Sequence, residues 1–321
     1  YATTAHTFHK GNDAETDCRV CHMPTRTYMG NDVRHDHNFY VPRPDLSAKY
    51  GTPNACNACH SDKSAQWAAK AVVQWYGKER KPHFAEDLII GSKQTAESLP
   101  RLQSLLQTPN TPDIIRAAAL HYLGGQPSEA RYPLIVRELT AADAQTRYRA
   151  VIALSEYPLS RYEAQLLPLL TDKVKAVRML AANALLTQKG LEACRVYNRF
   201  EQAHQEYKEF VLSQSDFPLG SATAGDYFVK INDTDNAIRF YERALLKDKQ
   251  LNYIRLNLAV LYSGKAQNDK AESFLNEALK YEPKNAQIYY DLYLLYNELG
   301  REAEAKVALS KAKALGIKGR F

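Results

Sequence analysis

Two copies of one five-residue pattern, set in a stretch with few apolar side chains, constrain this chain more than any other feature. The copies are Cys18–His22 (CRVCH) and Cys56–His60 (CNACH). The surrounding residues 1–62 contain six Leu, Ile, Val or Phe residues, namely Phe8, Val20, Val33, Phe39, Val41 and Leu46. That is about a tenth of the segment, and a segment below about a fifth does not readily fold by itself. Something other than side chains must therefore supply the core of this segment.

The Cys-x-x-Cys-His pattern is the attachment signature of c-type haem. Two thiols one helical turn apart can add to the two vinyl groups of one porphyrin, and the next residue brings an imidazole to the iron. We therefore predict two covalently bound c-type haems, each of which would add a large apolar face to the segment. The thiols come from Cys18, Cys21, Cys56 and Cys59, and the proximal imidazoles from His22 and His60.

Zinc and disulfides are the alternatives for the same cysteines. In a zinc ribbon the two Cys-x-x-Cys pairs usually lie about 15 to 20 residues apart. The gap between Cys21 and Cys56 is much longer than that. Zinc also gives no reason for a histidine after both pairs. A disulfide within a Cys-x-x-Cys pair closes so short a loop that it would stabilise the fold very little.

Local signals around the second motif predict where its helix begins and ends. Thr52 should cap the helix, with Pro53 at its first position. Residues 61–64 should separate it from an amphipathic helix over residues 65–76, which Gly77 ends. One face of that second helix carries Trp67, Ala71, Val72 and Trp75. We expect the two tryptophans to pack in a protein core, with packing on a haem edge as the alternative.

Each haem iron has a second axial position, and this segment is rich in candidate ligands. Apart from the attachment histidines, residues 1–60 contain His6, His9, His35 and His37, whereas the remainder of the chain contains three histidines (His83, His121 and His204). For any single one the alternative is a solvated loop histidine. As a group they favour bis-histidine iron, with two of the four binding. Met29 is a competing ligand, and Met23 cannot fold back to the iron of the adjacent His22.

Several short runs around the motifs resemble a known family. The runs are 21–24 (CHMP), 28–29 (YM), 36–39 (DHNF), 42–46 (PRPDL), 51–56 (GTPNAC), 67–68 (WA) and 75–77 (WYG). In this order they resemble the last haem-binding section of a bacterial multihaem cytochrome c family, whose members carry tetratricopeptide repeats behind the haems. The resemblance covers about residues 5–77 closely and the remainder at the level of architecture.

The resemblance also implies ligands and bears on the extent of the protein. A family histidine at the position of His37 follows the aspartate of a D-H-x-F motif, and family histidines at His6 and His9 precede the first haem motif. His35 matches no ligand position. We predict His37 and His9 as the distal ligands of this chain.

Family members usually have further haem motifs upstream, so the chain has either lost them or is one piece of a longer protein. His6, or His9 in its place, is then expected to contact the iron of a haem held by another segment or subunit.

A 31-residue repeat begins near residue 95. Arg116, Arg147 and Arg178 each stand near the start of a helix with small residues at the following positions, and Leu139 matches Leu170 in the preceding helices. Paired helices of this kind resemble HEAT repeats, although the usual repeat is about 40 residues. An irregular helical bundle is the alternative.

The last third has a 34-residue repeat. Ala237, Ala271 and Ala305 mark the same position of three tetratricopeptide repeats, over about 218–251, 252–285 and 286–319. A clustered set of tyrosines, Tyr289, Tyr290, Tyr293 and Tyr296, should be mostly core, with some as interface anchors. A long helix over about 190–212 should precede the repeats, with Cys194 as a buried small hydrophobe and His204 on the surface.

The predicted fold is therefore mostly α-helical. A loop-rich, haem-organised c-type cytochrome segment (1–80) is followed by an α-solenoid, made of HEAT-like repeats (81–190), a connecting helix (191–217) and three tetratricopeptide repeats (218–321). Stacked repeats bury one continuous core and present a surface that suits a protein partner.

The pattern predicts an electron-transfer protein, periplasmic or extracellular and bacterial, whose helical repeats dock redox partners or further haem-bearing subunits. One alternative is a subunit of a multihaem oxidoreductase with an open haem site for a small nitrogen or sulfur substrate; another is a structural subunit of a filament or complex. The net charge of +6 is spread along the 321 residues without an aromatic-studded basic stripe, which argues against nucleic acid. No apolar run is long enough for a membrane span. The first residue, Tyr1, is consistent with removal of a signal peptide or with truncation.

Overall fold

The computed structural model describes residues 3–10, 16–78, 82–186 and 200–317. These residues are mainly helical, as predicted, with one two-stranded sheet among them. None of their helices is long and apolar enough to cross a membrane. The chain divides into two compact units, Tyr1–Gln126 and Pro127–Phe321. The first helices of the predicted HEAT-like region thus belong to the same unit as the predicted cytochrome segment.

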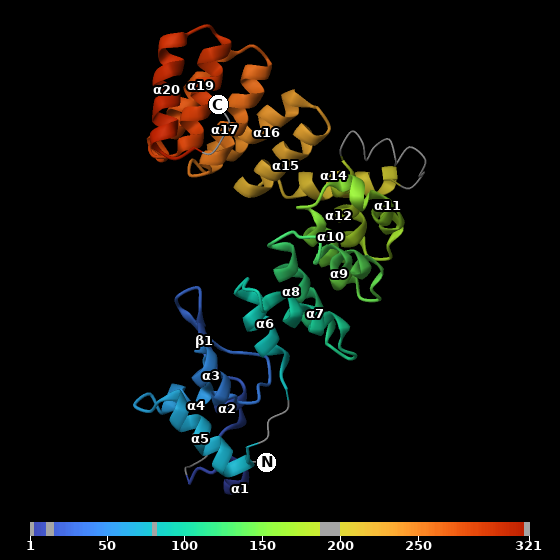
Figure 1. The fold of residues 1–321 in the computed structure, drawn as a ribbon, viewed down its shortest axis with the longest axis vertical. Helices are drawn as coiled ribbons and strands as arrows, with labels where there is room; N and C mark the ends of the chain where they lie inside the picture. Colours follow the sequence, from blue (N-terminus) through green and yellow to red (C-terminus); the bar gives the residue numbers. More distant parts are fainter. Residues whose placement is uncertain (1–2, 11–15, 79–81, 187–199, 318–321) are drawn as a thin grey trace. The chain divides into compact units, whose positions relative to one another are not determined.

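The N-terminal segment, which the sequence predicts to bind haem, consists over its described residues of short helices and one hairpin (Figure 1). Its elements are α1 (Thr4–Thr7), α2 (Cys18–His22), β1 (Thr25–Tyr28), β2 (Asp32–His35), α3 (Pro44–Tyr50), α4 (Ala55–Cys59) and α5 (Ala65–Tyr76). The two strands are antiparallel, with Thr25 opposite His35. The hairpin thereby returns the chain to the end of α2.

The caps of these helices follow from side chains that reach free backbone N–H groups. The side chain of Asn54 accepts a hydrogen bond from the N–H of Asn57 and caps α4, so the prediction of Thr52 as the cap was wrong. Because Asn54 also donates to Ser47 Oγ (2.9 Å), the same residue ties α4 to α3. Ser64 caps α5 through the N–H of Trp67, in the stretch expected to separate the two helices.

Side chains alone give this segment very little core. Of the six apolar residues counted above, Leu46 is buried, whereas Phe39, Val33 and Val41 are 67 %, 66 % and 74 % exposed. In α5 the buried residue is Ala68, and this helix packs against α3. The prediction of buried tryptophans was wrong, because Trp67 is 39 % exposed and Trp75 is half-buried. Both tryptophans contact the histidines described below.

The HEAT-like spacing appears in the helix boundaries. The first unit ends with α6 (Phe84–Ser92), α7 (Ser98–Gln107) and α8 (Asp113–Gly124), and the second begins with α9 (Tyr132–Arg137), η1 (Glu138–Thr140), α10 (Ala144–Leu154), η2 (Leu159–Arg161), α11 (Glu163–Leu166), η3 (Leu167–Thr171) and α12 (Lys175–Leu185). Helices α8, α10 and α12 begin at the predicted period, and Leu139 and Leu170 are both buried in the helices before α10 and α12.

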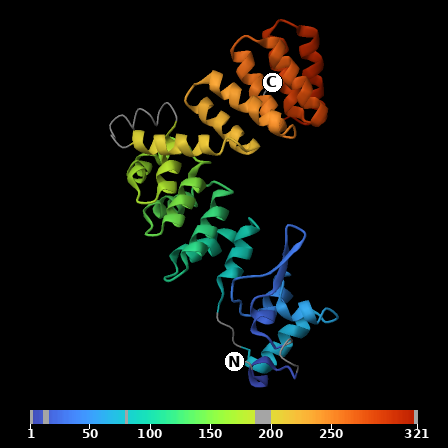
Figure 2. The ribbon, with the colours of Figure 1, turned by 180° about the vertical axis from the view of Figure 1, so that it is seen from behind.

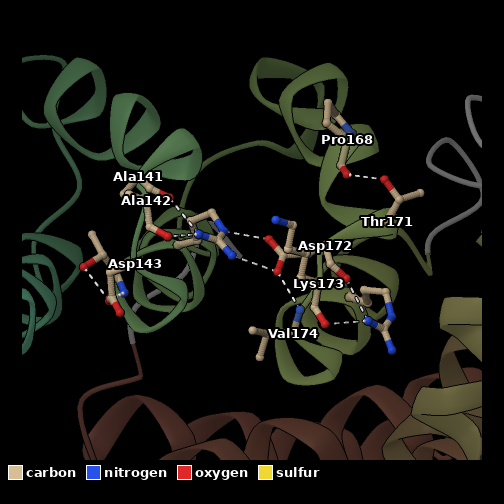
Figure 3. Close-up of polar contacts among 11 residues, drawn as sticks. Ala141, Ala142, Asp143, Pro168, Thr171, Asp172, Lys173 and Val174 are labelled. Atoms are coloured by element: carbon tan, nitrogen blue, oxygen red, sulfur yellow. Dashed lines mark hydrogen bonds and ion pairs between the residues drawn. The ribbon is translucent and has the colours of Figure 1, made fainter.

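The arginines of this repeat join neighbouring helices (Figure 3). The Arg147 guanidinium donates to the carbonyl oxygens of Ala141 and Ala142, each at 2.7 Å, and pairs with both carboxylate oxygens of Asp172. Arg178 repeats the arrangement one unit later, with the carbonyls of Asp172 and Lys173 and the carboxylate of Glu206. Each guanidinium thus satisfies carbonyl groups left free where the preceding helix ends.

The predicted long helix begins, among the described residues, as α14 (Phe200–Ser213); Cys194 lies outside them. His204 on α14 is not the surface histidine that was predicted. Its Nε2 lies 2.9 Å from the hydroxyl of Tyr227, and burial lowers its pKa. It joins α14 to the first tetratricopeptide helix.

Three helix pairs follow at the predicted period and lie side by side in both views (Figures 1 and 2). They are α15 (Pro218–Lys230) with α16 (Thr234–Lys247), α17 (Asn252–Gly264) with α18 (Asn268–Tyr281), and α19 (Ala286–Glu298) with α20 (Glu302–Ala314). Ala237, Ala271 and Ala305 are all buried, which lets the paired helices approach closely. The four clustered tyrosines are partly exposed, and two of them, Tyr293 and Tyr296, pack against the core.

Candidate functional site

The two Cys-x-x-Cys-His motifs fold as two short helices, α2 and α4, that pack against each other. In each helix the two cysteines are three residues apart and share a face. All four thiols are free of disulfides. Burial raises the pKa of the Cys21 thiol, and the nearby Cys59 and Cys18 raise it further. The motifs, which are well separated in sequence, are therefore neighbours in the fold.

The first attachment histidine has a fixed orientation. Nδ1 of His22 lies 2.5 Å from the carbonyl oxygen of Tyr40. A carbonyl only accepts hydrogen bonds, so Nδ1 carries the proton and Nε2 keeps a free lone pair. A hydrogen bond of this kind commonly fixes the tautomer of a metal-binding histidine.

The hairpin brings Tyr40 to His22. After β2 the chain returns along α2, where the Tyr40 N–H donates to the His22 carbonyl (2.8 Å) and the Tyr40 hydroxyl donates to Asp36 (2.8 Å). The N–H of Asn38 and this hydroxyl lower the pKa of Asp36. Phe39 lies flat on the His22 ring, with 4.3 Å between ring centroids. This support of His22 was not apparent from the sequence, because it depends on the register of the hairpin.

His6 lies opposite His22. The ring centroids are 6.1 Å apart and the ring planes are 13° from parallel. His6 belongs to the last turn of α1, well upstream of His22 in the sequence.

His9 lies opposite the second attachment histidine in the same way. The ring centroids of His9 and His60 are 6.1 Å apart, with the planes 28° from parallel. Nδ1 of His9 lies 2.5 Å from the Thr7 carbonyl oxygen, so its Nε2 also keeps a free lone pair. Each motif histidine thus has one partner from the N-terminal segment.

These two distances fit a haem iron between the rings. A histidine nitrogen binds a metal at about 2 Å, so two imidazoles on opposite sides of one iron have centroids roughly 6.3 Å apart. Stacked aromatic rings cover the same range of distances. Iron ligation is favoured because the separation recurs at both motifs, with a carbonyl holding Nδ1 in one ring of each pair. The residues present therefore fit two bis-histidine haems.

A tetrahedral zinc site would require a different arrangement. Such a site needs four protein ligands, usually cysteine and histidine. Among the described residues, no group of three or more His, Cys, Asp or Glu side chains is placed to hold a metal ion. A bis-histidine haem needs only two imidazoles from the protein at the iron, because the porphyrin supplies the other four nitrogens.

The remaining candidate ligands lie elsewhere. His37 is exposed and, within the described part of the chain, is not stacked on either attachment histidine. His35 is half-buried, with Nδ1 2.7 Å from the Met23 carbonyl oxygen. Met29 is fully exposed at the hairpin turn. The structure thus brings His9 beside one motif histidine and His6 beside the other, whereas the sequence favoured His9 and His37 as distal ligands. The ligand assignment itself stays a prediction.

The tryptophans of α5 lie against the histidines. Trp67 lies 5.0 Å from the His60 ring, and Trp75 is edge-on to His9 at 6.3 Å, both between centroids. They lie beside the second histidine pair, and the alternative that they pack on a haem edge stays a prediction.

The comparison with known protein families identifies one of the C-terminal repeats. A tetratricopeptide repeat model matches residues 253–285, which span most of α17 and all of α18. No curated protein matches the chain. The fold therefore defines a mainly helical protein with tetratricopeptide repeats, a class that binds other proteins.

Proposed function

We propose that this chain is a c-type cytochrome that carries two bis-histidine haems and passes single electrons to protein partners docked on its helical repeats. The observation that carries the proposal is the pairing of both motif histidines with imidazoles at 6.1 Å. When bound, each haem would supply an iron that gains and loses one electron.

The residues of the chain would each have a defined part in holding the two groups. Thiols of Cys18 and Cys21, and of Cys56 and Cys59, would form the covalent attachments. His22 and His60 would be the proximal ligands, and His6 and His9 the distal ones. The Tyr40 and Thr7 carbonyls would hold two of these imidazoles in the tautomer that leaves Nε2 free. Phe39 and Trp67 would exclude water beside the two proximal rings.

Electron transfer is favoured over catalysis because each proximal histidine already has an opposing imidazole. The alternative of an oxidoreductase needs one iron with an open distal position. His6 and His9 would close both positions, and one of them would have to leave before a small substrate could bind. The third hypothesis, a structural subunit of a filament or complex, also rests on the repeats and does not require an open site.

The repeats support docking of a protein partner. Tetratricopeptide repeats present a curved surface made of neighbouring helices, and the match at 253–285 supports this interpretation. Because c-type haem is attached outside the cytoplasmic membrane, we propose a periplasmic or extracellular location. The family resemblance of residues 5–77 extends the proposal to a multihaem assembly, in which other haem-bearing segments are candidate partners.

The proposal is tested first by haem content. Mass spectrometry of the denatured chain should show two haem additions, and a pyridine haemochrome assay should give the c-type band. Stoichiometric zinc with no haem would refute it.

The ligand assignment is tested by spectroscopy. His6→Ala and His9→Ala should each convert one haem from low-spin to high-spin, with the change visible in ferric EPR and absorption spectra. His37→Ala is the matched control and should leave both haems low-spin. The opposite pattern, with a high-spin haem in His37→Ala and none in His6→Ala, would return the distal role to His37.

A further inference from the structure

One short segment carries both distal candidates. His6 and His9 are three residues apart in Thr3–Lys10, a stretch with no buried residue in its helix α1. A segment this short and exposed does not hold its own conformation. The position of both imidazoles must therefore come from contacts with other parts of the chain.

Two aromatic residues at the end of α5 supply such contacts. Phe8, between the two histidines, lies parallel to Trp75 with 4.7 Å between ring centroids and 1° between planes. The Tyr76 ring meets the Phe8 ring edge-on, with 5.5 Å between ring centroids and 82° between ring planes. The Tyr76 hydroxyl also donates a hydrogen bond to the carbonyl oxygen of His6. Parallel and edge-on contacts are the two favoured aromatic geometries.

The backbone of Phe8 gives independent evidence that this contact matters. Its φ is +56°, in the left-handed region that a bulky side chain rarely adopts. Phe8 caps α1 there, and its N–H donates to the Thr4 carbonyl. Such a conformation persists where surrounding contacts hold it. The turn at Phe8 separates the directions of His6 and His9, so that they face different motif histidines.

Helix α5, which carries Trp75 and Tyr76, also contacts the attachment histidine of the second histidine pair, His9 and His60. Trp75 reaches His9 edge-on, and Trp67, two turns earlier on α5, lies against His60. Ala68 of the same helix is buried, and the helix packs against α3. Trp75 and Tyr76 therefore stand on a helix with a fixed position in this unit.

We infer that Phe8, Trp75 and Tyr76 form an aromatic clamp that positions the distal ligands of both haems, so that the two irons gain or lose their distal imidazoles together. This inference rests on the proposed function. The clamp residues are positioning residues, since they act through His6 and His9. Opening the clamp frees both imidazoles at once, because they flank Phe8 on one short segment.

The test uses the full haem-loaded protein and the variants Phe8→Gly and Trp75→Leu. Glycine adopts the left-handed conformation of Phe8 without strain, so Phe8→Gly removes the ring and keeps the turn accessible. Both variants should show a high-spin fraction about twice that of His6→Ala or His9→Ala, and added imidazole should restore low-spin spectra. Tyr28→Leu, which removes an exposed aromatic of the hairpin, is the control and should match the unsubstituted protein.

The outcomes separate the clamp from the proposed function. If the unsubstituted protein holds no covalent haem, the proposed function fails. If it holds two low-spin haems and both clamp variants remain low-spin, or if one haem alone changes, the clamp is refuted. If Phe8→Gly or Trp75→Leu fails to retain two haems, the variant Tyr76→Phe tests the clamp instead. Loss of its hydroxyl should speed imidazole binding at both haems, and an unchanged rate would overturn the inference.

Discussion

Replacing Arg147 with alanine should destabilise the HEAT-like repeats far more than the loss of an ordinary surface ion pair. Its guanidinium makes two hydrogen bonds to Asp172 (2.6 and 2.8 Å) and one to each of the carbonyls of Ala141 and Ala142. The Arg147 side chain is 14 % exposed and the Asp172 side chain 6 %. The alanine variant would leave a nearly buried carboxylate without its charged partner.

The size of the effect follows from that burial. Removing one member of a buried ion pair costs about 3–5 kcal/mol, because the other charge is left uncompensated. Since Arg147 keeps some contact with water, which weakens an ion pair, we expect about 2–4 kcal/mol. The matched control is Arg243→Ala, whose partner Asp216 is 83 % exposed. An exposed pair of this kind contributes about 0–1 kcal/mol.

The penalty should also depend on pH. Burial alone would raise the pKa of Asp172, but hydrogen bonds from Arg147 and from the N–H of Val174 bring it below its ordinary value. A carboxylate with a lowered folded pKa stabilises the fold above its unfolded pKa of about 4 and loses that contribution as the pH falls. The difference between the unsubstituted protein and Arg147→Ala should therefore shrink as the pH falls from about 7 toward about 3.

Hydrogen exchange of α10 and α12 measures this local stability without requiring the whole chain to unfold in one step. A loss of about 2–4 kcal/mol predicts roughly 30- to 700-fold faster exchange of their protected amides at pH 7, at about 1.4 kcal/mol per tenfold change. Arg243→Ala should leave these helices unchanged. If Arg147→Ala accelerates exchange less than about fivefold, or by the same factor at pH 7 and at about pH 3, the pair does not stabilise the repeat in the way described.

Three further predictions concern other parts of the chain. Gly225→Ala should destabilise the tetratricopeptide repeats by about 1–3 kcal/mol in urea unfolding, because the added Cβ would overlap the Tyr241 ring. The control Gly264→Ala, which has open space around it, should change stability by less than about 1 kcal/mol. Burial lowers the pKa of His204, so its pKa in the folded state lies below its pKa in the unfolded state. Helix α14 should therefore lose stability as the pH falls below about 6.5. His204→Gln should remove this pH dependence, measured by hydrogen exchange of α14. Replacing all four motif cysteines with alanine should leave residues 95–319 protease-resistant and residues 1–62 quickly degraded, since bound haem stabilises only the state that holds it. The residues changed there are Cys18, Cys21, Cys56 and Cys59, and an N-terminal segment that stayed intact would contradict the last prediction.

The repeats could be predicted closely from the sequence because their information is local and periodic. The 31-residue spacing of Arg116, Arg147 and Arg178 matched the starts of α8, α10 and α12. The 34-residue spacing of the alanines matched three helix pairs. What the spacing did not predict is the partner of each arginine, since Asp172 and Glu206 lie in the next repeat or beyond it. Packing of the next helices decides those contacts.

The candidate haem site, too, could be predicted only in part from the sequence. The two Cys-x-x-Cys-His motifs, the shortage of apolar side chains and the surplus of histidines were evident from the sequence, because each is a matter of residue type and short spacing. Which imidazole faces which motif was decided by the hairpin and by the turn at Phe8, two features that act over distances the sequence does not display. They put His6 opposite His22 and leave His37 away from both motif histidines. Spacing along the chain thus predicts the kind of group this segment would hold, whereas the tertiary structure decided which imidazoles face the motif histidines, because direction in space depends on every turn between two residues.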